Sequence, residues 1–156
     1  MKTRLFCGMA LVVALGAAFQ AQSAATAPAS DRDKFIGAWR LVSLQLPGAD
    51  RKVVSVPGLK GTLIYTRDGH MSVQIMYPRS EAALSNDYVL NGYEASFGSY
   101  EVDEAKHTVT HHVQGSITQG LVGKTLERHY RFTDDGRLII TSARSDEHWS
   151  VLWEHY

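Results

Sequence analysis

TLIYTRDGHMSVQIMY, residues 62–77, decides the fold because it has the pattern of a β-hairpin. Two runs of β-branched, aromatic and other apolar residues flank the dipeptide Asp-Gly, which supplies the positive φ angles that a tight turn between strands needs. In the second run every other residue is apolar, at Met71, Val73 and Ile75, so one face of that strand is apolar and the other is polar. The pattern predicts two antiparallel strands that turn one face toward a core.

Strand patterns of the same kind continue along most of the chain. They cover residues 37–46, 93–102, 107–116, 125–132, 137–143 and 148–155. Together with the hairpin they make about eight strands joined mostly by short turns, which is typical of an all-β up-and-down barrel or of a sandwich. An antiparallel barrel is favoured because closure leaves no exposed sheet edge. Apolar residues at helical spacing occur at 79–92, where we expect a short helix or a crossing loop.

The first residues have the pattern of a secretory signal peptide. A charged start with Lys2 and Arg4 precedes an apolar core, and the small residues Ala21 and Ser23 follow it as a cleavage site. Glycines interrupt the apolar run, which falls short of the ~20 residues that span a bilayer. We therefore expect cleavage after Ser23, no integral membrane association afterwards, and a periplasmic or secreted protein.

Cleavage would divide the sequence into a signal peptide at 1–23, a short leader at 24–31 and one barrel domain at 32–156. The only cysteine of the sequence, Cys7, leaves with the signal peptide, so the domain must be held together by its core. Because the signal peptide carries two basic residues and no acidic one, the 16 Lys and Arg of the sequence fall to 14, against 16 Asp and Glu. This slight acidity gives no basic patch for nucleic acid.

Several segments of the chain resemble a known family. The start GAWRLVS resembles the G-x-W motif of lipocalins. Four further segments resemble the bacterial and fungal lipocalin-like domain family, namely residues 61–78, 97–116, 121–132 and 150–155. The resemblance implies a small β-barrel of the lipocalin type and much less about activity. In lipocalins a terminal basic side chain covers the tryptophan of G-x-W, and here His155 would cover Trp39. We expect the three tryptophans, Trp39, Trp149 and Trp153, to plug the barrel.

Two neighbouring histidines lie in residues 107–116, which read HTVTHHVQGS. Because strand side chains alternate, His111 shares the inner face with two valines, whereas His112 points to water. Adjacent strand residues cannot bind one metal ion, and His107 lies roughly 13 Å from His111 along the strand, too far for two ligands of one ion. A site formed by His112 with residues of 125–132 would lie outside the barrel without enclosing partners. We therefore predict no metal and no cofactor.

His111 and Arg128 are the polar residues that the alternation turns inward. His111 is either a core histidine that is hydrogen-bonded to a Tyr or Ser, or the polar anchor of a ligand cavity. Arg128 shares a face with Leu126 and Tyr130 and is always charged. It either reaches out to water at the barrel mouth or receives a carboxylate or enolate-like oxygen of a ligand.

The sequence favours an exported protein that binds a small, mostly apolar or amphipathic molecule with a polar or anionic group. An eight-stranded barrel has an interior just wide enough to be filled by side chains or to hold one such ligand. The predicted ligand contacts are Trp39 as the floor of the cavity, Tyr65, His111, Arg128 and Tyr130.

Two other classes of function stay open. A small barrel enzyme of the cyclase or isomerase type would use His111 as general acid or base. No nucleophile, base and acid stand at a recognisable spacing, so we favour a protein without enzymatic activity and assign no catalytic residue. A barrel with a packed interior would act through its surface, and the volume of the interior separates this class from the other two. The pattern sets neither the ligand nor the oligomeric state.

Overall fold

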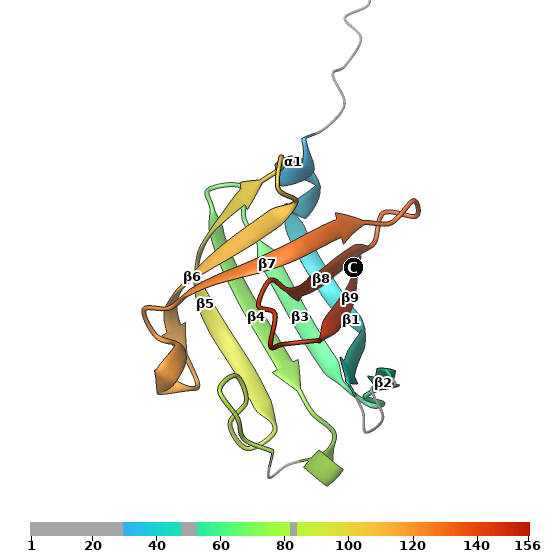
Figure 1. Ribbon diagram of the computed structural model, residues 1–156, viewed down its shortest axis with the longest axis vertical. Coiled ribbons are helices and arrows are strands. Elements are labelled where there is room, and N and C mark those ends of the chain that lie inside the picture. The colour runs from blue at the N-terminus through green and yellow to red at the C-terminus, as the bar shows by residue number, and fades with distance from the viewer. Residues whose placement is uncertain (1–29, 48–52, 82–83) are drawn as a thin grey trace, which may run out of the picture.

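The computed structural model describes residues 30–47, 53–81 and 84–156, and its main feature is one antiparallel sheet that closes on itself (Figure 1). The predicted signal peptide and nearly all of the predicted leader lie outside the described residues. The barrel strands are β1 (Gly37–Pro47), β3 (Lys60–Tyr65), β4 (His70–Met76), β5 (Tyr93–Asp103), β6 (Thr108–Ser116), β7 (Thr125–Phe132), β8 (Leu138–Ser142) and β9 (Ser150–His155). The remaining elements are the helix α1 (Asp31–Phe35), the short strand β2 (Val53–Ser55) and the 3-10 turns η2 (Arg79–Glu81) and η3 (Gln119–Leu121).

The strand order follows the chain. Each barrel strand pairs with the next one, from β1 with β3 to β8 with β9, and β1 also pairs with β9 and so closes the ring. Trp39 on β1 lies opposite Leu63 on one side and His155 on the other. β2 only extends the sheet where Pro47 lies opposite Val53 at the end of β1. The structure confirms the predicted eight-stranded antiparallel up-and-down barrel.

The helix α1 covers one end of the barrel, which we call the closed end and which lies at the top of Figure 1. Ser30 caps the helix, because its hydroxyl accepts a hydrogen bond from the backbone N–H of Asp33 at 3.1 Å. Phe35 is fully buried, and its ring meets the rings of Tyr65 and Tyr130 edge to face at centroid distances of 5.0 and 4.8 Å. The short helix therefore places an aromatic plug in the barrel.

Trp39 completes the closed end. Its side chain has no exposed surface, and its indole N–H donates to the carbonyl oxygen of Phe35 at 2.8 Å. The ring of His155 stacks on the indole with 3.6 Å between the ring centroids and 29° between the planes. The structure thus confirms the prediction that His155 covers Trp39.

The connections at the opposite end, which we call the open end, are longer than the turns at the closed end. They comprise residues 77–92, 117–124 and 143–149, in addition to the connection that follows β1. The described part of the predicted crossing segment contains η2 and a loop in which the side chain of Asn86 accepts hydrogen bonds from the backbone N–H groups of Tyr88 and Val89. No helix among the described residues is long and apolar enough to cross a membrane.

Candidate functional site

A cavity of about 220 Å³ lies inside the barrel, in the half nearer the open end. Most of its wall is apolar and comes from residues on five strands, among them Leu63, Val73, Ile75, Ile140 and Val151. The polar residues that reach the wall include Tyr77, Asn86, Tyr88, Glu94, His111 and Arg128. The interior is therefore not completely filled by side chains, and the cavity combines an apolar wall with a few ionisable groups.

His111 lies on the inner face of β6, where Tyr100 and Leu126 are its neighbours across the two ladders. The side chain is buried, and its Nε2 lies 2.7 Å from the hydroxyl of Tyr65. Burial, helped by the charge of Arg128, holds the pKa of His111 well below its ordinary value. Burial also raises the pKa of Tyr65. Both groups are therefore neutral near pH 7 and form a neutral hydrogen-bonded pair.

Arg128 lies on the inner face of β7, opposite Val109 and Ser142, and is 8% exposed. Its guanidinium group lies 4.9 Å from the ring centroid of Trp149 and 5.7 Å from that of Tyr88. No ion pair links it to a carboxylate in the described part of the chain. Because an arginine stays charged, the cavity wall contains a permanent cation whose close partners are aromatic rings.

Glu94 is the acidic residue of the cavity wall. It lies opposite Ile75 in the β4–β5 ladder, and residues that face each other across a ladder share one face of the sheet. Burial in this apolar wall raises the pKa of the carboxyl group to about 7, although the charge of Arg128 acts in the opposite direction. Glu94 is therefore close to half protonated at neutral pH.

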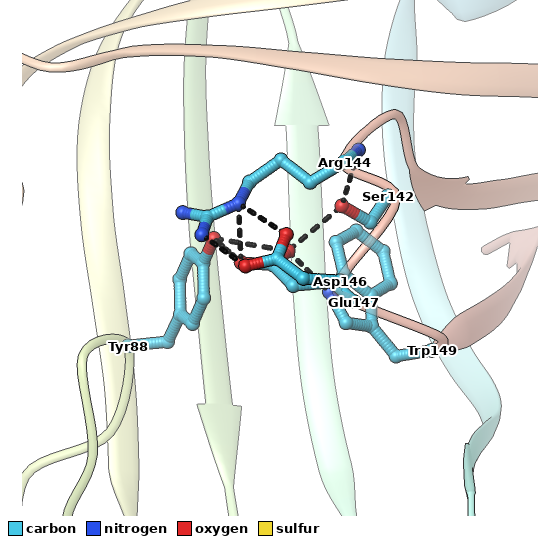
Figure 2. Close-up of polar contacts among 6 residues, drawn as sticks. All are labelled: Tyr88, Ser142, Arg144, Asp146, Glu147 and Trp149. Carbon is cyan, nitrogen blue, oxygen red and sulfur yellow. Dashed lines mark hydrogen bonds and ion pairs between the residues drawn. The ribbon is translucent and has the colours of Figure 1, made fainter.

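A second carboxylate, that of Glu147 in the turn between β8 and β9, organises the rim of the cavity (Figure 2). It accepts hydrogen bonds from the hydroxyl groups of Tyr88 at 3.0 Å and Ser142 at 2.7 Å and from the indole N–H of Trp149 at 3.1 Å. The Nε of Arg144 lies 3.3 Å from the same carboxylate. Burial alone would raise the pKa of Glu147, but these hydrogen bonds and the charge of Arg144 lower it overall.

The structure brings two of the five predicted ligand contacts to the cavity wall, namely His111 and Arg128. Tyr65 lies behind His111 and contacts it through the hydrogen bond described above. Trp39 and Tyr130 are not among the lining residues and lie at the closed end, where the hydroxyl of Tyr130 donates to Asp31 at 2.9 Å. Alternation predicts which face of a strand a residue occupies, but it does not predict how far along the barrel that residue lies.

Several residues of the site were not predicted as ligand contacts from the sequence, among them Tyr88, Glu94, Glu147 and Trp149. Trp149 does not join Trp39 in the plug, because it lies at the open end and lines the cavity. A signal for Glu94 was available, since it alternates in step with Ser96, Gly98 and Tyr100. The sequence did not show whether that face points into the barrel or out to water, because aromatic residues occur on both faces of β5.

His112 points outward, as the alternation predicts. Its Nδ1 lies 3.3 Å from the hydroxyl of Thr125 and its Nε2 lies 3.7 Å from the carboxylate of Glu101. Among the described residues there is no group of three or more His, Cys, Asp and Glu that could hold a metal ion.

The match to a family model agrees with this architecture. The family model described as the lipocalin-like domain matches residues 36–154, which include the barrel strands from β1 to β9 except the last residue of β9. A crystal structure of a mutant of the fluorescent protein UnaG is similar with a TM-score of 0.41 and 13% sequence identity, over 80% of this chain and 97% of that chain. No curated protein matches the chain in sequence. The match to the family model covers most of the chain, and the chain therefore belongs to the lipocalin-like domain family.

Proposed function

We propose that the protein binds a small, mostly apolar molecule with an acidic group, and that Arg128 receives the acid. The observation that carries this proposal is a buried guanidinium at the wall of an apolar cavity, with aromatic rings as its close partners. A carboxylate that reaches Arg128 would form a charge-assisted hydrogen bond in a site with little water, where such a bond is stronger than at the surface.

The volume of the cavity limits the size of the ligand. Pockets that enclose drug-sized molecules have volumes of roughly 300–1,000 Å³, and this cavity has about 220 Å³. The ligands that fit best are medium-chain fatty acids and acids with one aromatic ring. The neutral pair of His111 and Tyr65 would then offer one further hydrogen bond inside the cavity.

Glu94 would make the binding of an acid depend on pH. Below pH 7 its carboxyl group is protonated and can donate a hydrogen bond to the ligand. Above pH 7 it becomes an anion in the same cavity, repels an acidic ligand and competes with it for Arg128. We therefore expect acids to bind more tightly at pH 6 than at pH 8. We assign this dependence to Glu94 rather than to His111, because the lowered pKa of His111 keeps that side chain neutral over the same range.

We further propose that the protein acts outside the cytoplasm, as a periplasmic or secreted binding protein. This rests on the charged start, the apolar core and the small residues around Ser23. The mass of the intact protein from the exported fraction tests it. A mature chain that begins near Ala24 is expected, and a species that retains Cys7 would contradict the export proposal.

A second candidate function is a barrel enzyme that transfers protons, such as an isomerase. The observation in its favour is the pKa of about 7 of Glu94, because a general acid or base works best near its own pKa. Glu94 would take the role that the sequence suggested for His111. Exchange of solvent deuterium into the acidic C–H positions of small ketones, lost in Glu94→Gln, would support this candidate.

The binding proposal is tested with a matched pair of probes, octanoic acid and its methyl ester. Trp149 and Trp153 line the cavity, so tryptophan fluorescence can report the binding of both. At pH 6 we expect wild type to bind the acid roughly tenfold or more tightly than the ester, because a hydrogen bond to a charged group contributes about 1.5–3 kcal/mol. Arg128→Leu should bind both probes about equally.

Arg131→Leu is the control for this experiment. It removes the same charge from the same strand, but at a residue that is exposed. It should keep the preference for the acid. The proposal is wrong if wild type binds neither probe or shows no preference, or if Arg128→Leu prefers the acid as strongly as wild type.

A further inference from the structure

Tyr88 and Trp149 share two partners. They come from different segments of the open end, the crossing loop and the turn between β8 and β9. The ring of each contacts the guanidinium of Arg128. The polar hydrogen of each is donated to the carboxylate of Glu147 (Figure 2). Glu147 thus holds both of the rings that lie against Arg128.

The hydrogen bonds of Glu147 also leave the charge of Arg128 available. The two carboxylate oxygens of Glu147 accept hydrogen bonds from Tyr88, Ser142 and Trp149 and form an ion pair with Arg144. A carboxylate has about four acceptor positions, so these four partners occupy them. Glu147 therefore forms its ion pair with Arg144 and not with Arg128.

Ser142 ties this arrangement to the strand that carries Arg128. It lies directly opposite Arg128 in the β7–β8 ladder, and its hydroxyl donates to Glu147 at 2.7 Å. Ser142, a residue of the strand next to that of Arg128, therefore holds the carboxylate of Glu147 at the position along the barrel where Arg128 lies. The side chain of Glu147 is only 18% exposed, so water competes little for its hydrogen bonds.

We propose that Glu147 is a positioning residue of the ligand site: it fixes the rings of Tyr88 and Trp149 against Arg128 and so aims the guanidinium at the cavity, which makes the site select an acid over the matching neutral molecule. This inference rests on the proposed function, because it concerns the same cavity and the same arginine. Glu147 itself does not touch the ligand.

The sign of the effect separates positioning from simple electrostatics. Removing a negative charge close to Arg128 makes the site more positive, and by itself this should strengthen the binding of an acid. If Glu147 acts by positioning, its removal frees the two rings and the guanidinium, and the binding of an acid becomes weaker. The two explanations thus predict opposite changes for the same substitution.

The test uses Glu147→Gln, which keeps the size of the side chain but replaces one accepting oxygen by an NH₂ group that cannot accept from Tyr88 or Trp149. Affinities for octanoic acid and methyl octanoate are measured at pH 6 by tryptophan fluorescence. We expect the acid to lose roughly tenfold in affinity, as a misplaced charged partner does. The affinity for the ester should change less than about twofold, which also shows that the cavity is intact.

Asp146→Asn is the matched control. It removes the same charge from the adjacent residue, whose carboxylate pairs with Arg144 at 2.7 Å and has no hydrogen bond to Tyr88 or Trp149. We expect it to keep the wild-type preference for the acid. Equal losses in the Asp146 and Glu147 variants would overturn the inference, because the loss would then not depend on the hydrogen bonds that only Glu147 accepts from Tyr88 and Trp149.

A second variant, Tyr88→Phe, decides the matter if Glu147→Gln does not fold. It keeps the ring against Arg128 but removes the hydroxyl that binds Glu147, and it should lower the preference for the acid by about two- to tenfold, the effect of one hydrogen bond. An unchanged preference in this variant, or in folded Glu147→Gln, overturns the positioning role alone. Wild type without any preference would instead overturn the proposed function, and this inference with it.

Discussion

The two ends of the barrel are built from the same eight strands and differ in almost everything else. At the closed end the connections are tight turns at 66–69, 104–107 and 133–137, and the interior is a set of buried rings around Phe35 and Trp39. At the open end the connections are long, and a cavity with ionisable groups takes the place of the plug. Strand alternation therefore sets which residues form the inner surface of the barrel, whereas the connections at each end decide whether that part of the interior is filled by side chains.

The largest expected loss of stability comes from a substitution at the closed end. Trp39→Ala removes a fully buried indole and its hydrogen bond to Phe35, and should lower the free energy of unfolding by about 3–5 kcal/mol. Denaturant titration measures the loss, and Tyr93→Ala, which removes a half-exposed aromatic ring, is the control. The folded fraction should keep its preference for octanoic acid over the ester. A midpoint close to wild type would show that stability does not reside at the closed end.

An intermediate effect is expected at the open end, where burial of Glu94 links stability to pH. Its pKa is raised from 4.5 to about 7, so the folded state binds more protons than the unfolded state between these values. The contribution of Glu94 to stability is fully present below pH 4.5 and is lost as the pH rises through 7, a change of up to about 3 kcal/mol.

Glu94→Gln should remove this pH dependence. The difference in unfolding free energy between wild type and Glu94→Gln, measured from pH 4.5 to 8, should therefore change in favour of the variant as the pH rises. Glu127→Gln, at an exposed position on the outer face of β7, serves as the control and should keep a constant difference. Parallel curves for wild type and Glu94→Gln would mean that the carboxyl group is in contact with water.

The smallest expected effect sharpens the description of the closed end. His155→Ala removes the ring that stacks on Trp39, and should cost about 0.5–1.5 kcal/mol, the range for a pair of stacked rings. His148→Ala, at an exposed residue of the turn between β8 and β9, should have no measurable effect on the denaturation midpoint. If both variants unfold at the same denaturant concentration as wild type, the stack does not stabilise the barrel.

The fold could be predicted from the sequence because its signals are local. The hairpin at 62–77 is specified by the alternation of its strands and by its turn, in which Gly69, but not Asp68, has a positive φ angle. The inward positions of His111 and Arg128 followed from the alternation of their own strands. These features need no knowledge of distant residues.

The rest of the site depends on contacts between distant residues in irregular segments. Tyr88 and Glu147 are 59 positions apart, one in a loop and the other in a turn, where no period predicts the direction of a side chain. Their hydrogen bond exists because the closed barrel brings the two connections together at one end. Trp149 lies in the same turn segment, so its place at the open end rather than in the plug could not be predicted either.

The pairing of β1 with β9 has a consequence for the kinetics of folding. Every other ladder of the barrel joins strands that follow each other in the chain, whereas this one brings residues 39 and 155 together. The entropy cost of closing a loop grows with its length, so we expect the consecutive hairpins to form first and the seam between the two terminal strands to form last. Substitutions in that seam should then accelerate unfolding and leave the folding rate almost unchanged.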